Sequence, residues 1–322
     1  MSPDELDRHA LQPRVSVVVP FLNEAETLPA LITAVANLQQ QLKLPVELVL
    51  VDDGSQDGSG AIARQALQSR PELQAVVLEL SRNFGKEAAL TAGLEASRGD
   101  VVVPLDADLQ DPPELIGPML EQWRQGFDVV YAVRGQRAGE SRTKRLTAFG
   151  FYRLIGRMSA TTIPADTGDF RLMDRCVVEA LSQLPERTRF MKGLFAWVGF
   201  RQTAIRYNRE PRQEGRSNWN YWTLWNFALD GITSFSRVPL QLLSAGGMAI
   251  ALVSMVYGTW MVLRTLLFGI DLPGYASLMT AVLFLGGLQL VGLGVLGEYL
   301  GRVFEEVKRR PLYLVRQRWE QG

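Results

Sequence analysis

The N-terminal part of the chain alternates short apolar runs with longer segments in which apolar residues recur every three or four positions. The apolar runs have the length of buried strands and lie at 15–19, 48–51, 76–80, 101–105 and 129–132. Helical spacing is found between them, at 24–42, 59–67 and 86–96. This alternation predicts an α/β domain with a mostly parallel sheet, helices on both of its faces, and the carboxyl ends of the strands along one edge.

The last third of the chain has a different pattern. No charged residue occurs at 238–263 or at 272–297, and both stretches are 26 residues long. A helix needs about 20 residues to cross a bilayer. We therefore predict two transmembrane helices, at 237–267 and 274–300, joined by a short connector into a hairpin.

The segment at 218–236 precedes this hairpin and is rich in tryptophan. Its aromatic and aliphatic residues recur at helical spacing and are Trp219, Trp222, Trp225, Leu229, Ile232 and Phe235. Because indole rings favour the boundary between water and lipid, the pattern predicts an amphipathic helix that lies along the membrane. Packing of this face against the preceding domain or a neighbouring subunit is the alternative.

Charge indicates the topology of these segments and narrows the possible partners. The chain has 34 basic and 34 acidic residues, a balance that argues against nucleic acid as a partner. Residues 1–13 form a polar leader without the apolar core of a signal peptide. Basic residues flank the outer ends of the hairpin and are absent from its connector, so the domain at 14–217 and the basic tail at 301–322 are expected to be cytoplasmic.

Glycines in the second span permit close contacts between protomers, so we also expect a homo-oligomer.

Two aspartates, Asp106 and Asp108, follow the apolar run at 101–105. Side chains alternate along a strand, so both carboxylates are expected to point the same way where the chain leaves the sheet. Their repulsion is relieved if a divalent cation lies between them and a polyphosphate, because hard cations take carboxylate and phosphate oxygens as ligands. Two acids in a solvated turn are the alternative interpretation.

Polar residues follow the other predicted strands as well. They are Pro20 and Glu24 after the first strand, Asp52 and Asp53 after the second, Arg82 and Lys86 after the third, and Arg134 after the fifth. Right-handed crossovers bring these strand ends to one rim of the sheet. Acids for a metal ion, together with arginine and lysine for phosphate, predict a site for a nucleotide diphosphate.

Four segments resemble the motifs of family-2 glycosyltransferases with the GT-A fold, a Rossmann-like α/β fold. These segments are VVVPFLNE (17–24), LVDDGSQDGS (50–59), SRNFGKEAAL (81–90) and DADLQDPPE (106–114). Further on, TGDFRLMDR (167–175) and FALDGITSFSRVPLQL (227–242) resemble the polyprenyl-phosphate glycosyltransferases, which include bactoprenol glucosyltransferases and, more distantly, dolichol-phosphate mannose synthases. The resemblance extends from near Arg14 to near Pro311.

The resemblance implies an inverting transferase that moves a hexose, with glucose from UDP-glucose favoured, to polyprenyl (undecaprenyl) phosphate at the cytoplasmic face of the bacterial inner membrane. The nucleotide-sugar site that it implies comprises Pro20, Glu24, Asp52, Asp53, Arg82, Lys86, Asp106 and Gln110. Within this site Asp106 and Asp108 would hold Mg²⁺ or Mn²⁺ on the diphosphate. Asp52 or Asp53 would contact the uracil and ribose, although a helix N-cap or an Asx turn is the alternative for Asp53.

Asp169 lies in TGDFRLM, and the resemblance places it beside the anomeric carbon as the catalytic base, with Asp108 as a second catalytic residue. A lipid monophosphate has a second pKa near 6, so it is already a dianionic nucleophile at neutral pH and requires no strong base. Asp169 could instead orient the acceptor or stabilise positive charge on the sugar. A turn acid without function is the third interpretation.

Two basic loops are candidates for binding phosphate groups. The residues expected to do so are Arg134 and Arg145 at the acceptor phosphate, and Arg212, Arg216 and Ser217 at the pyrophosphate. The second loop, REPRQEGRSNW, resembles one that closes over the pyrophosphate in relatives, but Asn218 stands where the family has lysine. A solvated basic face is the alternative for such runs.

Other functions remain open at this point. A mannosyltransferase or aminosugar transferase of the same family would share these motifs, as would a membrane module that binds nucleotide sugar without catalysis. A processive polysaccharide synthase is disfavoured because the chain has no Q-x-x-R-W string and only one predicted hairpin. A nucleotidyltransferase is disfavoured because the first strand is not followed by a glycine-rich loop.

Overall fold

The computed structural model describes residue 8 and residues 11–134, 167–187, 189–207, 238–268 and 274–322. Several predictions fall outside these residues, namely those for most of the leader, for Arg145, Arg212, Arg216 and Ser217, and for the amphipathic helix at 218–236. The described residues form two compact units. The first contains residues up to 207 together with 310–322, and the second contains residues from 238 to 309.

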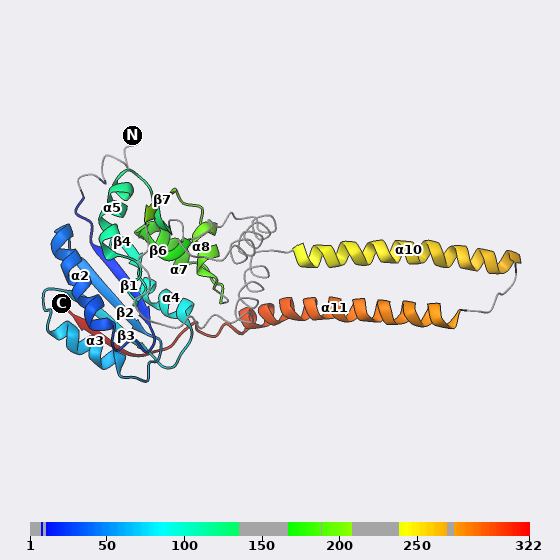
Figure 1. Cartoon of the computed structure of the whole chain (residues 1–322), viewed down its shortest axis with the longest axis horizontal. Helices are drawn as coiled ribbons and strands as arrows, with labels where there is room; N and C mark the ends of the chain where they lie inside the picture. The colour runs from blue at the N-terminus through cyan, green and yellow to red at the C-terminus, as the bar shows by residue number, and fades with distance from the viewer. Residues whose placement is uncertain (1–7, 9–10, 135–166, 188, 208–237, 269–273) are drawn as a thin grey trace. The chain divides into compact units, whose positions relative to one another are not determined.

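The first unit is built on a sheet of eight strands in the described part of the chain (Figure 1). The order across the sheet is β7-β5-β6-β4-β1-β2-β3-β8. The strands are β1 (Val15–Phe21), β2 (Val46–Asp52), β3 (Gln74–Leu80), β4 (Val101–Pro104), β5 (Val129–Arg134), β6 (Thr167–Asp174), β7 (Gln202–Tyr207) and β8 (Val315–Gln321). Only β6 and β8 run antiparallel to their described neighbours, which confirms the mostly parallel sheet.

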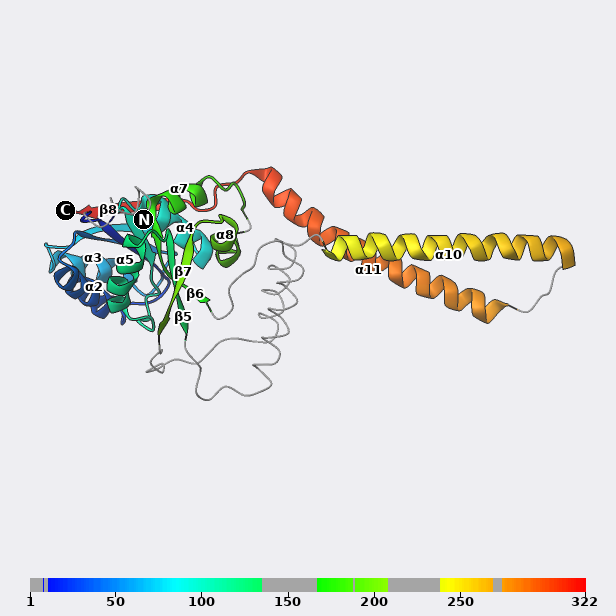
Figure 2. The ribbon, with the colours of Figure 1, turned by 90° about the horizontal axis from the view of Figure 1, so that it is seen from above.

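Helices cover both faces of this sheet, as predicted (Figure 2). They are α2 (Leu28–Leu42), α3 (Ser59–Gln68), α4 (Lys86–Ala96), α5 (Ile116–Arg124), α7 (Arg175–Ser182) and α8 (Met191–Trp197), with a short 3₁₀ turn at Pro113–Leu115. On one face Val17 of β1 belongs to the same buried cluster as Leu31 of α2 and Met119 of α5. On the other face α4 packs so closely on β1 that a Cβ at Gly93 would collide with Val18. Successive residues of β1 therefore face different helical layers.

The start of the first helix differs from the prediction. It begins at Leu28 rather than at residue 24, with a proline in its first turn, which is the position that best tolerates proline. Asn23, just after β1, has a positive φ of 55°, so the chain makes a turn before the helix begins. This turn leaves Glu24 outside the helix and free to contribute to the rim of the sheet.

The segment at 301–322, which the sequence analysis treats as a basic tail, contains the end of a long helix and the strand β8. β8 runs antiparallel to β3, with Trp319 opposite Val77. Trp319 packs against the buried cluster, whereas most other side chains of this edge strand are exposed. The strand therefore has no apolar run, which explains why sequence periodicity does not reveal it.

The second unit consists of two long helices, α10 (Val238–Phe268) and α11 (Tyr275–Lys308). Each contains a stretch long and apolar enough to cross a membrane, at Leu243–Trp260 and Phe284–Lys308. The two helices come close where a Cβ placed on Gly292 of α11 would be 3.7 Å from Cδ2 of Leu243 in α10. Their apolar side chains are largely exposed in the protein alone, as expected for helices of a membrane hairpin.

The packing of β8 leads to a prediction about stability. Trp319→Ala removes the apolar contact of β8 with the core and should lower the melting temperature of the first unit by about 3–6 °C. Arg316→Ala, at an exposed position of the same strand, should change it by less than about 1 °C. Differential scanning fluorimetry of the full chain in detergent measures both. Equal melting temperatures for the two variants would contradict a structural role for β8.

Candidate functional site

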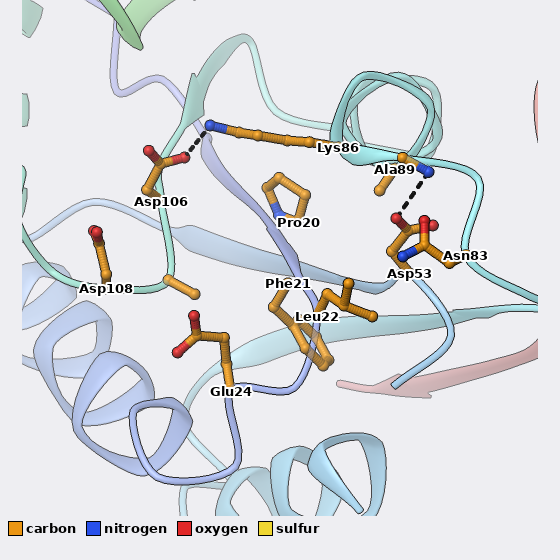
Figure 3. A pocket seen from close by; sticks show the side chains of 12 residues that line it. Pro20, Phe21, Leu22, Glu24, Asp53, Asn83, Lys86, Ala89, Asp106 and Asp108 are labelled. Atoms are coloured by element: carbon orange, nitrogen blue, oxygen red, sulfur yellow. Dashed lines mark hydrogen bonds and ion pairs between the residues drawn. The ribbon is translucent and has the colours of Figure 1, made fainter. Parts of the chain in front are cut away.

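A cavity of about 320 Å³ lies at the carboxyl ends of β1, β2 and β4 (Figure 3). The residues that line it come from the end of β1, from the segments that follow β1, β2, β3 and β4, and from the start of α4. They are Pro20, Phe21, Leu22, Glu24, Asp53, Asn83, Gly85, Lys86, Ala89, Asp106, Ala107 and Asp108. The cavity therefore forms at the sheet edge where the sequence analysis places the site.

Asp106 and Asp108 both line this cavity. The prediction explained their common direction by the alternation of side chains along a strand, and this explanation is wrong. β4 ends at Pro104, so both aspartates lie in the turn beyond the strand. Leu109 has a positive φ of 54°, and the backbone N–H of Gln110 donates to Oδ1 of Asp108 at 3.2 Å. The turn itself therefore sets the direction of these carboxylates.

Lys86 joins two acids that are far apart in the sequence. Its Nζ lies 2.7 Å from Oδ1 of Asp106 and 2.7 Å from Oδ2 of Asp169. Lys86 belongs to the first turn of α4, Asp106 follows β4, and Asp169 lies in β6. Figure 3 shows the Lys86 side chain reaching across the cavity wall to Asp106. Three structural elements thus meet at one ammonium group.

This ammonium influences the pKa of both carboxyls. Burial is the largest influence on Asp169 and favours its protonated form, but the Lys86 charge and hydrogen bond outweigh burial and lower the pKa of Asp169. Burial also dominates at Asp106, where Lys86 only partly offsets it and the negative charges of Asp169 and Asp108 add to it, so the pKa of Asp106 is raised. The pKa of Lys86 rises despite burial because two carboxylates face it. Lys86 is therefore fully charged at neutral pH.

Arg171 and Glu87 form a second layer around Asp169. The buried Arg171 donates from Nη2 to the carbonyl of Gly168 at 2.9 Å, and its guanidinium lies 3.8 Å from the centre of the Phe195 ring. Burial lowers the pKa of Arg171 to about 10, which leaves it charged at neutral pH. Burial, reinforced by repulsion from Asp169, raises the pKa of Glu87 to about 7. Arg171 therefore holds the backbone beside Asp169, and its charge helps to lower the pKa of Asp169.

Asp53 forms hydrogen bonds with the backbone just before α4. Its Oδ1 accepts from the backbone N–H of Phe84 at 2.7 Å and its Oδ2 from that of Gly85 at 2.9 Å. Gly85 has φ of 99°, a conformation that favours glycine. Burial, more than any other influence, raises the pKa of Asp53. Asp52 instead accepts from the N–H of Ser55 at 2.7 Å in a local turn.

The structure brings together most of the predicted nucleotide-sugar residues. The cavity is lined by Pro20, Glu24, Asp53, Lys86, Asp106 and Asp108, whereas Asp52, Arg82 and Gln110 do not line it. Arg82 stacks on Phe84, with 4.1 Å from its guanidinium carbon to the ring centre, and donates to the carbonyl of Asn83 at 2.9 Å. Arg134 is the last residue of β5.

Some residues of the site are absent from the sequence predictions. Asn83 and Gly85 line the cavity, and the turn signal in SRNFGKE could have indicated them. Arg171 acts on Asp169 through its charge, and the charge of Asp169 in turn raises the pKa of Glu87. No local pattern marks their role, because it depends on contact between segments distant in sequence.

The cavity suits a hard divalent cation for which the protein supplies only some of the ligands. Asp106 and Asp108 supply carboxylate oxygens on one wall. Oδ1 of Asp169 is buried and has no hydrogen-bond partner among the described residues. The described residues contain no cluster of three or more histidine, cysteine, aspartate or glutamate side chains suited to a metal. Mg²⁺ and Mn²⁺ suit such a site because one or two carboxylates, substrate phosphates and water can complete their coordination.

Comparisons with known proteins identify the family and the fold. The family model "Glycosyl transferase family 2" matches residues 16–182. An uncharacterized glycosyltransferase of Synechocystis sp. is 54% identical over 95% of both chains. The bactoprenol glucosyl transferase of Shigella phage SfII is 46% identical over 94% of this chain and 98% of its own. Among solved structures, mannosyl-3-phosphoglycerate synthase from Rubrobacter xylanophilus has a TM-score of 0.50 and 23% identity over 76% of this chain and 78% of its own, a likeness that supports the fold.

The Lys86 ion pairs predict a pH-dependent loss of stability in Lys86→Met. In the wild type, the lowered pKa of Asp169 adds stability above the unfolded pKa of 3.8, and this stability is lost as the pH falls through the folded pKa. In Lys86→Met the ammonium is absent, and burial raises the pKa of Asp169. The ionised Asp169 carboxylate then lowers the free energy of unfolding at neutral pH, and protonation of this carboxylate removes the loss. The difference in melting temperature between wild type and Lys86→Met should therefore be largest near pH 7.5 and shrink toward about pH 5.

Lys86→Arg, which keeps the charge, is the matched control and should show a much smaller difference at every pH. Thermal melts of the three proteins across this pH range provide the measurement. A difference between wild type and Lys86→Met that does not change with pH would contradict the assigned ion pairs.

Proposed function

The chain belongs to glycosyl transferase family 2, and from this premise we propose that it transfers glucose from UDP-glucose to a polyprenyl phosphate, with inversion, at the cytoplasmic face of a bacterial inner membrane. The observation that carries the proposal is the ion-pair cluster in which Lys86 joins Asp106 to Asp169 at the rim of the sheet. The names of the bactoprenol glucosyl transferase relatives support the acceptor and the sugar.

The donor occupies the cavity beside this cluster. Pro20 and Glu24 border the base pocket, and Asp53 lies where it can meet the ribose while it holds the start of α4. A Mg²⁺ or Mn²⁺ ion held by Asp106 and Asp108 would act as a Lewis acid that neutralises charge on the diphosphate. Lys86 adds a second positive charge on the same wall.

The transfer requires charge stabilisation more than proton removal. An oxygen of the lipid phosphate bonds to the anomeric carbon, the bond from this carbon to the diphosphate breaks, and its electron pair leaves with UDP. The phosphate is already dianionic near neutral pH, so no proton has to be removed. Because Lys86 keeps the pKa of Asp169 low, Asp169 is a weak base. We therefore assign Asp169 to orienting the reactants and stabilising positive charge on the sugar.

The two apolar helices support a membrane-anchored enzyme whose acceptor is a lipid. The basic flanks of the predicted spans favour a cytoplasmic first unit. Arg134 and Arg145 remain our candidates for the acceptor phosphate, and Arg212, Arg216 and Ser217 for the pyrophosphate. A homo-oligomer formed through the glycine-rich face of α11 is part of the same proposal.

Mass spectrometry of the lipid product tests this function. The full-length protein in detergent is supplied with undecaprenyl phosphate, Mn²⁺ and one of a panel of UDP- and GDP-sugars. We expect a hexose adduct from UDP-glucose, its loss on chelation with EDTA, and its return when Mn²⁺ or Mg²⁺ is added in excess. Asp169→Asn should lower the rate at least about 100-fold, whereas Glu114→Gln, at an exposed position outside the cavity, should not.

Two results would contradict the proposal in different ways. Binding of UDP-glucose without formation of any lipid product would indicate a nucleotide-sugar-binding module. A product formed from GDP-mannose or a UDP-aminosugar, but not from UDP-glucose, would assign a different sugar to the same fold.

A further inference from the structure

Asp111 is an acidic residue of the segment DADLQDPPE that does not line the cavity. Asp106 and Asp108, in the same segment, do line it and are partly exposed, whereas Asp111 is only 2% exposed. A carboxyl group withdrawn from water lowers stability unless it has a hydrogen-bond partner. The burial of Asp111 therefore indicates that its partner, rather than a ligand in the cavity, explains its place in this segment.

The partner of Asp111 is Tyr207, whose hydroxyl donates to Oδ1 of the carboxyl group. Tyr207 is the last residue of β7, lies 96 residues further along the chain and is itself buried. In the described sheet β7 is an edge strand, and β5 and β6 separate it from β4. The hydrogen bond therefore joins the turn after β4 to a strand with which β4 does not pair.

Tyr207 also contacts the strand that carries Asp169. Its ring meets that of Phe170 edge to face, with the ring centres 6.5 Å apart and the planes at 78°. Phe170 follows Asp169 directly in β6 and is buried. Phe170 and Tyr207 belong to the same buried cluster as Ala107, the residue between the two aspartates of the turn. One side chain thus links the turn after β4, through its hydroxyl, to β6, through its ring.

We propose that Tyr207 and Asp111 are positioning residues, which fix the turn after β4 relative to β6 and thereby set the affinity of the cation site. This inference rests on the proposed function, in which Asp106 and Asp108 hold Mg²⁺ or Mn²⁺ on the diphosphate. Neither Tyr207 nor Asp111 lines the cavity, so both act through the turn. A hard cation with few protein ligands requires those ligands at fixed positions, and a turn that can move binds it less tightly.

Tyr207→Phe tests the hydrogen bond because it removes the hydroxyl and keeps the ring that contacts Phe170. With UDP bound, the Kd for Mn²⁺, measured by electron paramagnetic resonance of the free ion, should rise about tenfold, as on loss of other supporting contacts of metal sites. The Mn²⁺ concentration for half-maximal activity should rise by the same factor. At saturating Mn²⁺, kcat should stay within about twofold of wild type, because the ring still supports β6.

Variants of Asp111 test the other partner of the bond. Asp111→Ala should raise the Kd for Mn²⁺ as Tyr207→Phe does. Asp111→Asn keeps an oxygen that can accept from the Tyr207 hydroxyl and should recover most of the affinity. Adding Tyr207→Phe to Asp111→Ala should weaken Mn²⁺ binding no further, because residues that act through one shared bond are not additive. Additive losses in the double variant would contradict the pairing.

Ser16→Ala is the matched control for loss of a buried bond between a hydroxyl and a carboxylate. Ser16 donates to the buried Glu47 near the amino ends of β1 and β2, at the edge of the sheet opposite the cavity. Ser16→Ala and Tyr207→Phe should both lower the melting temperature, but only Tyr207→Phe should weaken Mn²⁺ binding. An unchanged Kd for Mn²⁺ in Tyr207→Phe, or an equal rise in Ser16→Ala, would overturn the inference.

Failure of the proposed function is a separate outcome. If the wild type binds Mn²⁺ with UDP but makes no lipid product, the transfer reaction is wrong, and the Kd values for Mn²⁺ still decide whether Tyr207 and Asp111 support the site. If the wild type with UDP binds no Mn²⁺, the cation site is wrong and the inference is overturned with it.

Discussion

The ion pairs of Lys86 with Asp106 and Asp169 are the interaction on which the geometry of the site depends. The three residues belong to α4, the turn after β4 and strand β6, so their contact brings together segments up to 83 residues apart. Burial alone would favour the protonated form of both carboxyls. One positive charge counteracts burial at both and keeps Asp169 ionised beside the cavity.

Hydrogen bonds and close packing hold α4, and with it this lysine, in place. Asp53 accepts two hydrogen bonds from the backbone just before α4, and Gly93 allows the same helix to pack directly on β1. Asp53 thus has a structural task besides the contact with nucleotide that we propose for it. Arg171 supports the other partner by binding the backbone next to Asp169. A family-2 glycosyltransferase fold can therefore position charge through helix packing and a few buried hydrogen bonds.

Sequence periodicity predicts β1 to β5 and misses β6, β7 and β8. β1 to β5 are apolar because helices cover them, whereas β8 is an edge strand in which only Trp319 reaches the core. Asp169 has the sequence context of a turn residue but lies in β6, whose pairing with β5 no local pattern reveals. The motifs identify Asp106 and Lys86 separately. Their contact depends on long-range packing.

In the proposed function, Asp106 and Asp108 hold a cation that contacts the diphosphate, and the Lys86 ammonium is the neighbouring positive charge. A structure of the protein with UDP and Mn²⁺, in which anomalous scattering locates the metal, tests it most directly. The account predicts a manganese peak in contact with the carboxylates of Asp106 and Asp108 and with the diphosphate, while Lys86 remains beside Asp169. A diphosphate bound without a manganese peak at these two aspartates would contradict it.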